Sequence, residues 1–395
     1  MSRSTAPGAT TRWPSNGTAA STRSTILKRS GCVLDDHLRG DNMKIKTLAI
    51  AAASLIASAS AFNASAAPDK LRYVGTYSNL SLFKDFERPY WTSGEKILGR
   101  KLDVSVNSFD QMGLNGSEIF RMLSQGMFDV GTTMSAYAIG SAPEMEGVDL
   151  PMLVTTAEQS REIVEVYRPQ LERIFAERFR GAQLLAITRF PQQAVFCNFP
   201  LKQLKDLKGK KIRVPGGSSA EFVEALGASP VNMPFAEVTA ALERGALDCA
   251  TTGILSAYAV GWHQVTTHFL PVPVGGWGYT MTVMNGRAWN SLSKEDQAAL
   301  KKSIAANFEE PALKSAEADF ETGINCLTGR AECPLGQSGK MVMSPVLPED
   351  VELARKILRE KVIPSWASRV SKENLKAWNS TIGEHTGLKY EGKPE

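Results

Sequence analysis

The chain has 395 residues, of which 43% are hydrophobic and 22% are charged, and its formal net charge is +4. A chain of this length can bury a sizeable core and is more often divided into two lobes than built as one. The positive charge is confined to the beginning: residues 67–395 contain 37 basic and 38 acidic residues. This near-neutral balance argues against nucleic acid or an anionic membrane surface as a partner and favours a small ligand.

Residues 43–66 have the order of a secretory signal peptide. Two lysines stand in the first four residues, an apolar, alanine-rich run follows over 47–62, and Ala64 and Ala66 supply small residues before a cleavage point. The apolar run of about 16 residues is short compared with the roughly 20 that a spanning helix needs, so an uncleaved anchor is the weaker alternative. The sequence therefore predicts export to the periplasm.

The signal has its own methionine, Met43, and residues 1–42 before it show no periodic apolar pattern. We interpret 1–42 as an upstream extension produced by a misassigned start. Cleavage after the signal would make Ala67 the first residue of the mature protein, which is expected to be soluble.

Four cysteines follow the signal. Cys326 and Cys333 enclose a short polar loop, and an oxidising compartment favours a disulfide between them. A metal site is the alternative, but the spacing is too wide for a Cys-x-x-Cys pair and no second ligand pair accompanies it. Cys197 and Cys249 lie in apolar, strand-like runs and are predicted to be unpaired core residues. No metal and no cofactor are predicted.

Short strand-like runs alternate with amphipathic helix-like runs, which predicts an α/β protein. Between 294 and about 324 the helical pattern is interrupted only by Pro311, which predicts a long bent helix. Ser218 and Glu221 have the spacing of a capping box at the start of another helix. Strands are predicted over 71–77, 102–108, 128–133, 182–188, 193–198, 211–214 and 246–252, and further helices over 117–125, 218–226, 237–244, 350–359 and 372–382.

An ordered set of motifs runs along most of the chain. The central pieces are LKGKKIRVP (207–215), LGASPVNMPFAEV (226–238) and LERGALD (242–248), with GMFDVG, VDLP and NGRAW at 126–131, 148–151 and 285–289. The set resembles the solute-binding proteins of TRAP (tripartite ATP-independent periplasmic) transporters, of the dicarboxylate-binding type. Glu243 and Cys249 stand where that family usually has glutamine and glycine.

The resemblance implies a two-lobed periplasmic binding protein fold with an interdomain cleft and a long bent connecting helix. Lobe I would comprise 70–190 plus 280–340, and lobe II 191–279 plus 341–395. The protein would close on a small organic anion, deliver it to the TRAP permease membrane subunits for ion-gradient-driven uptake without ATP, and act as a monomer.

Arg213 is the first candidate for the ligand site. It ends a strand just before a helix start, so its planar guanidinium could hold a carboxylate, or a sulfonate, while free amides at the helix start add positive potential. An ordinary surface salt bridge is the alternative for a lone arginine. The resemblance places the family's ligand-binding arginine at this position.

Other site positions are carried over from the resemblance. Phe235 falls where the family places a phenylalanine against the ligand, and Thr252 where sialic-acid-binding members have asparagine. Gln193 aligns with a second arginine of those members and Met134 with a glutamate, so sialic acid is not the expected substrate. Arg189 could replace the missing cation or point to solvent.

Aromatic side chains could line the cleft or pack in the core. The candidates are Trp277 and Tyr137, for which the two alternatives are even, and Tyr77 and Trp91, for which core packing is favoured.

An enzyme is the competing class of function. The mature chain contains three histidines and lacks a Gly-x-Ser-x-Gly elbow, a His-Glu-x-x-His motif and nucleotide-binding glycine motifs. We therefore predict that the protein is not an enzyme. A receptor that presents its ligand to a sensor is a further alternative that the sequence leaves open.

Overall fold

The computed structural model describes residues 70–99 and 102–392, which lie in one compact unit. The signal segment 43–66, the upstream extension 1–42 and Ala67 lie outside the described residues. Within the described ranges, no helix combines the length and the apolarity needed to cross a membrane.

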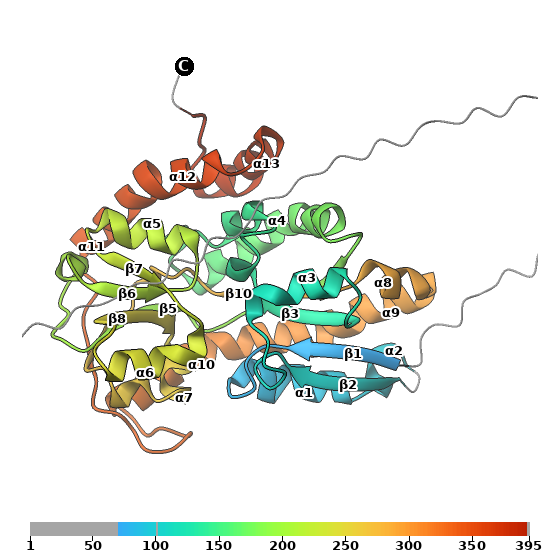
Figure 1. Ribbon diagram of the computed structural model, residues 1–395, viewed down its shortest axis with the longest axis horizontal. Coiled ribbons are helices and arrows are strands. Elements are labelled where there is room, and N and C mark those ends of the chain that lie inside the picture. Colours follow the sequence, from blue (N-terminus) through green and yellow to red (C-terminus); the bar gives the residue numbers. More distant parts are fainter. Residues whose placement is uncertain (1–69, 100–101, 393–395) are drawn as a thin grey trace, which may run out of the picture. The chain divides into compact units, whose positions relative to one another are not determined.

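The first sheet has five strands in the order β2-β1-β3-β10-β4 (Figure 1). β1 pairs in parallel with β2 and β3, whereas β10 runs antiparallel to both β3 and β4. β3 and β10 are buried at every residue, as expected for strands covered on both faces. The strands are β1 (Lys70–Gly75), β2 (Asp103–Ser108), β3 (Val130–Met134), β4 (Gln183–Arg189) and β10 (Tyr279–Met284).

Helices and short helical turns, the latter labelled η, surround this sheet. α1 packs on β2, α3 on β3 and α4 on β4. The elements are η1 (Leu82–Glu87), α1 (Arg88–Thr92), α2 (Glu95–Leu98), η2 (Gly116–Glu118), α3 (Ile119–Ser124), η3 (Ser135–Tyr137), η4 (Pro143–Val148) and α4 (Ala157–Arg178).

The second sheet has six strands in the order β11-β9-β5-β8-β6-β7. The strands are β5 (Gln193–Cys197), β6 (Lys211–Val214), β7 (Ser229–Asn232), β8 (Cys249–Gly253), β9 (His268–Leu270) and β11 (Val342–Met343). The helical elements along this part of the chain are η5 (Leu204–Leu207), α5 (Gly217–Ala225), η6 (Phe235–Glu237), α6 (Val238–Glu243), α7 (Ile254–Ala259) and η7 (Trp262–Gln264). The chain passes between the two sheets over 190–192 and again over 271–278.

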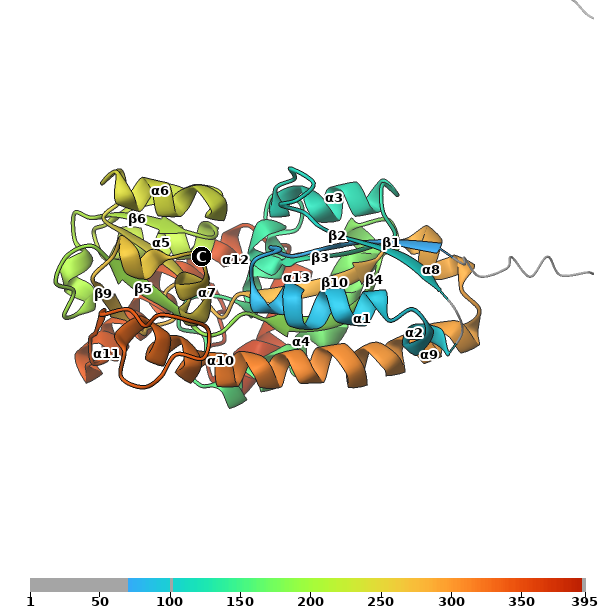
Figure 2. The same ribbon diagram turned by 90° about the horizontal axis from the view of Figure 1, so that it is seen from below.

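The predicted long bent helix is confirmed. α8 (Gly286–Ser291) precedes α9 (Lys294–Ile304), a π turn η8 (Ala305–Glu309) and α10 (Glu310–Thr328). Figure 2 shows α9 and α10 following one another as a rod, which packs on α2 near one end and on α7 near the other. Pro311 lies in the first turn of α10, directly after the π turn of a continuous helical rod. Proline has no N–H to donate to the helix, and a π turn before it is a common local adjustment to such an interruption.

The C-terminal helices contact elements from both parts of the molecule. α12 packs on both α5 and η4, and η10 packs on α4. Trp378 donates its indole N–H to the carbonyl of Gly147 at 2.7 Å, and Trp366 donates to that of Pro143 at 3.0 Å. The segment 341–395, predicted as part of lobe II, therefore also holds η4 of the first part. The elements are α11 (Pro348–Ile357), η9 (Leu358–Val362), α12 (Ile363–Ser368), α13 (Lys372–Trp378), η10 (Asn379–Gly383) and α14 (Glu384–Thr386).

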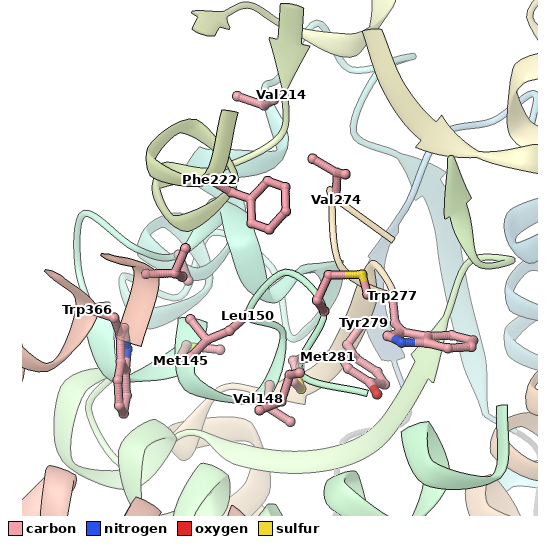
Figure 3. Close-up of a cluster of buried hydrophobic side chains, with 14 of the residues drawn as sticks. Met145, Val148, Leu150, Val214, Phe222, Val274, Trp277, Tyr279, Met281 and Trp366 are labelled. Carbon is pink, nitrogen blue, oxygen red and sulfur yellow. The ribbon is translucent and has the colours of Figure 1, made fainter. Parts of the chain in front are cut away.

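A single hydrophobic cluster includes residues from both sheets and from the C-terminal helices. Figure 3 shows Phe222 of α5, Met281 of β10 and Trp366 of α12 in this cluster, together with Trp277. All four are buried. Burial of these apolar side chains stabilises the arrangement of the two parts around the segment 271–278.

The predicted disulfide between Cys326 and Cys333 is present. The prediction for the other two cysteines was wrong, because Cys197 and Cys249 also form a disulfide. They lie directly opposite each other on the antiparallel strands β5 and β8, with their Cα atoms 4.2 Å apart. At this separation two side chains on the same face of a sheet can be bridged, and only the strand pairing brings them together.

The disulfide between Cys197 and Cys249 should contribute more stability than the one between Cys326 and Cys333. It spans 52 residues of sequence rather than 7, and the loss of chain entropy in the unfolded state predicts about 4 against about 2.5 kcal/mol. Guanidinium unfolding of the two double Cys→Ala variants tests this order. Equal losses of unfolding free energy would contradict it.

Glu87 makes the stability of the fold depend on pH. Its carboxylate accepts hydrogen bonds from the backbone N–H and the hydroxyl of Thr76, and burial raises its pKa to about 8 despite these bonds. The folded state therefore holds a proton that the unfolded state releases near its ordinary pKa of 4.5. The contribution of this group is fully present below pH 4.5 and is lost as the pH rises through 8.

We expect Glu87→Gln to flatten the pH dependence of the unfolding free energy, by roughly 3 kcal/mol between pH 5 and pH 8. Urea unfolding at several pH values measures this difference. Glu243→Gln, at an exposed position, is the control and should keep the slope of the wild type. A Glu87→Gln variant with the same slope would show that Glu87 does not titrate in this window.

Candidate functional site

Five of the seven predicted ligand residues line one small pocket between the two sheets. Its volume is ≈ 20 Å³, which holds little more than one water molecule. Arg213 comes from β6, Gln193 from β5 and Thr252 from β8, while Phe235 and Tyr137 come from η6 and η3. We call this the inner pocket. The other lining residues are Tyr77, Leu80, Met134, Phe190, Pro215, Thr251, Gly253 and Ser256.

An outer groove of ≈ 600 Å³ adjoins the inner pocket. The two cavities share Tyr77, Tyr137, Arg213 and Pro215. Arg213 is therefore reached from the groove, which has room for a small organic molecule. The remaining residues of the outer groove are Asn115, Gly116, Ser117, Ala136, Ile139, Gly140, Gly216, Gly217, Asn232, Met233 and Pro234.

Arg213 is buried, with 3% of its surface exposed. Its Nε donates to the carbonyl of Met233 and its Nη1 to that of Thr251, both at 3.2 Å. The guanidinium carbon lies 5.7 Å from the ring centroid of Phe235. No carboxylate among the described residues forms an ion pair with Arg213. The predicted alternative of a surface salt bridge is therefore excluded for this part of the chain, and a buried cation is left without an anionic partner.

Aromatic rings separate the inner pocket from the outer groove. The hydroxyls of Tyr77 and Tyr137 are 3.2 Å apart, and the ring of Tyr77 lies 5.2 Å from that of Phe235. Burial raises the pKa of Tyr77, as does the neighbouring Tyr137, while Arg213 opposes this shift. Tyr77 therefore stays a neutral hydroxyl. The ring of Tyr137 rests on Gly116, where a Cβ atom would come within 2.4 Å of it.

Two glycines of the segment 271–278 leave room for the side chain of Gln193. A Cβ atom at Gly275 would lie 2.1 Å from its Oε1, and one at Gly278 would lie 3.1 Å from its Nε2. Gly278 also has a φ of +65°, which disfavours other residues. The side-chain amide can therefore occupy this position only because both residues lack a side chain.

Two predicted residues, Arg189 and Trp277, do not line the inner pocket. Arg189 is 2% exposed, so it does not point to solvent. Its guanidinium carbon lies 4.8 Å from the Trp277 ring, and its Nη2 is 3.5 Å from Oε1 of Glu317. Trp277 donates its indole N–H to the carbonyl of Val154 at 3.1 Å and lies in the hydrophobic cluster (Figure 3). Arg189 instead lines a separate cavity of ≈ 500 Å³ beside α4.

The start of α5 is also different from the prediction. The N-cap is Gly216, and Ser218 does not form a capping box. Instead, the backbone N–H of Ser218 donates to Oε1 of the buried Glu146 at 2.7 Å, and Glu146 pairs with Arg369 at 2.9 Å. A carboxylate from η4 thus occupies the positive end of the helix, where the sequence predicted the anionic ligand.

Asp149 is a positioning residue that no sequence pattern indicated. Its carboxylate accepts backbone hydrogen bonds from Trp277 at 2.6 Å, Gly278 at 3.1 Å and Tyr279 at 3.3 Å. Burial raises its pKa to about 7, against the effect of these hydrogen bonds. Asp149 therefore holds the segment that supports Gln193. The motif at 148–151 contained it, but nothing in the sequence indicated its partners.

The described residues contain no group of three or more His, Cys, Asp or Glu side chains that could hold a metal ion. The arrangement offers one buried guanidinium, uncharged hydrogen-bonding groups and aromatic rings. Such a site can hold an organic anion.

We expect Asp149→Asn to lower the unfolding free energy by about 2 kcal/mol or more, because an amide cannot accept all three backbone hydrogen bonds. Thermal and urea unfolding measure the loss. Asp248→Asn is the matched control, since the Asp248 carboxylate accepts a backbone hydrogen bond from Lys211, and the change should cost about 1 kcal/mol. Similar losses in the two variants would contradict the positioning role of Asp149.

The chain is similar in sequence to known periplasmic binding proteins. Over 206 residues, the chain is 28% identical to a monocarboxylate 2-oxoacid-binding periplasmic protein of Nostoc, a match that covers 47% of this chain and 52% of the relative. The matches span about half to two-thirds of the length of such relatives.

Two solved structures share the fold. One is an extracytoplasmic solute receptor of Bordetella pertussis that binds pyroglutamic acid (TM-score 0.69, 19% identity, covering 78% of this chain and 99% of that one). The other is a TRAP periplasmic solute-binding protein of Desulfovibrio salexigens with bound orotic acid (TM-score 0.71, 15% identity, covering 81% and 99%). The fold is thus the two-lobed fold of these receptors, as the sequence predicted.

Residues 92–324 match the model of the DctP family, which is described as bacterial extracellular solute-binding protein, family 7. The match covers more than half of the chain and includes β2, β10 and most of the residues around Arg213. The chain belongs to the bacterial extracellular solute-binding proteins of family 7.

Proposed function

We propose that this chain is the periplasmic solute receptor of a TRAP transporter, and that it captures a small organic anion through Arg213 and delivers it to the permease subunits in the membrane. The observation that carries this proposal is a buried guanidinium with no carboxylate partner among the described residues, facing a groove large enough for a ligand. Family membership supports an extracytoplasmic place of action, and relatives that bind organic acids support the class of ligand.

Arg213 is oriented before the ligand arrives. A guanidinium has five N–H donors, and the carbonyls of Met233 and Thr251 each accept a hydrogen bond from one of them. These bonds hold its plane, so the remaining donors can meet the two oxygens of a carboxylate without loss of side-chain entropy. A sulfonate presents similar acceptors and remains within the proposal.

Ligand binding would favour the closed arrangement of the two lobes. Arg213 and Phe235 come from the second part of the chain, whereas Tyr77 and Tyr137 come from the first. A ligand that touches both sets binds best when they are close together, so it shifts the population toward closure. The segments 190–192 and 271–278 would act as the hinge, with lobe I over 70–190 and 280–340 and lobe II over the rest. We propose that a monomeric closed receptor docks on the permease.

We expect Arg213→Gln to weaken binding of organic acids by roughly 100-fold, because the charge and the bidentate fork are both lost. Arg213→Lys should lie in between, since it retains the charge but not the fork. Isothermal titration with acids selected by a thermal-shift panel measures both variants. Arg244→Gln, an exposed arginine of the same part of the chain, is the control and should bind like the wild type.

Three results would contradict the proposed function. One is the absence of any acid that raises the melting temperature, and another is unchanged binding in Arg213→Gln. The third is chemical turnover of a bound acid during prolonged incubation, detected by product analysis, which would identify an enzyme. Uptake of the acid by vesicles that contain the permease, dependent on this receptor, distinguishes transport from sensing.

A further inference from the structure

The inner pocket and the outer groove contain a single charged side chain. Among the described residues that line the two cavities, Arg213 is the only acidic or basic one. The others are aromatic, aliphatic or uncharged polar residues. The local charge of the site is therefore +1, which matches one ionised carboxylate and no further charge.

A second carboxylate on the ligand would lose its hydration without gaining a cation. Arg189 lies in a different cavity, where it contacts Trp277 and Glu317. Met134 stands where sialic-acid-binding members of the family have a glutamate, and it contributes an apolar side chain to the inner pocket. Burying an unpaired charge there is costly.

An ammonium group on the ligand would also lack a partner. The buried carboxylates behind the site, Asp149 and Glu146, do not line either cavity. Asp149 is bound to three backbone N–H groups, and Glu146 to the N–H of Ser218 and to Arg369. Neither carboxylate can turn toward the ligand without breaking these contacts.

The rest of the site suits an apolar body. Tyr77, Tyr137 and Phe235 form its aromatic part, and Leu80 and Phe190 extend the apolar surface of the inner pocket. Thr252 and Ser256 add hydroxyls that can bind an uncharged oxygen such as a keto or hydroxyl group.

We propose that the ligand of this receptor is a monocarboxylate whose other atoms are uncharged and mostly apolar. The inference rests on the proposed function, because it assumes that Arg213 holds the carboxylate. It narrows the ligand class to exclude dicarboxylates and amino acids.

Matched ligands that differ by one charged group test this on the wild-type protein. Pentanoate is compared with glutarate, in which a second carboxylate replaces the terminal methyl group, and 4-methylpentanoate with leucine, which adds an ammonium group. Isothermal titration should give affinities at least about 10-fold higher for the monocarboxylate of each pair, a difference of about 1.4 kcal/mol. Tighter or equal binding of glutarate or leucine would overturn the inference.

A charge introduced into the site provides a second test. Gln193→Glu nearly preserves the size of the side chain but places a negative charge in the inner pocket, so pentanoate binding should weaken on the order of 10- to 100-fold. Gln159→Glu makes the same charge change at an exposed position and should leave binding unchanged. The melting temperature without ligand verifies that each variant is folded. Undiminished binding in a folded Gln193→Glu would count against the single-charge site.

The outcomes separate this inference from the proposed function. If glutarate or leucine binds best and Arg213→Gln abolishes that binding, the receptor function stands and the monocarboxylate inference fails. If none of the four acids nor any member of the wider acid panel binds, the proposed function fails as well.

Discussion

The site depends on one buried positive charge that the protein does not neutralise. Burying a guanidinium without a carboxylate costs free energy, and two backbone carbonyls offset only part of that cost. Arg213 donates to the carbonyls of Met233, which directly follows β7, and of Thr251, which lies in β8. The pairing of the strands around β6 thus sets the orientation of the cation, and an anionic ligand can supply the missing charge.

The rest of the fold keeps other charged groups out of contact with Arg213. Glu146 could have paired with a cation in the groove, but it is committed to the first turn of α5 and to Arg369. Asp149 is committed to the segment 271–278. Arg189, only four residues from Gln193, stacks on Trp277 on the other side of that segment. Each of these contacts stabilises the fold and at the same time leaves the ligand site with a single charge.

The segment 271–278 links the stability of the fold to the geometry of the site. Its backbone is held by Asp149, its tryptophan lies in the cluster shared by both sheets and the C-terminal helices, and two of its glycines make room for Gln193. A change in this segment should therefore affect both folding and binding. The disulfide between β5 and β8 acts in the same region, because it fixes two strands that carry Gln193 and Thr252.

Local pattern and family resemblance were sufficient for much of this protein. They predicted the α/β class, the strand and helix around Arg213, the long helix interrupted near Pro311 and the disulfide within one short loop. These features depend on residues close in sequence or on an ordered set of motifs. Five of the seven proposed ligand residues line the same pocket. The resemblance supplied Arg213, Phe235, Gln193 and Thr252, whereas Tyr137 was a candidate because of its aromatic side chain.

The features that depend on contacts between distant segments became visible only in the folded chain. The pairing of Cys197 with Cys249 follows from the register of β5 and β8, which no short window of sequence contains. The capping of α5 by Glu146, rather than by its own Ser218 or by a ligand, depends on the position of η4. The same holds for Arg189 and Trp277, which the sequence offered as candidates for the cleft. Their contacts with each other, with Glu317 of α10 and with Val154 keep them out of the inner pocket. Sequence determined which groups are available to bind an anion, whereas the tertiary contacts determined which of them remain free to do so.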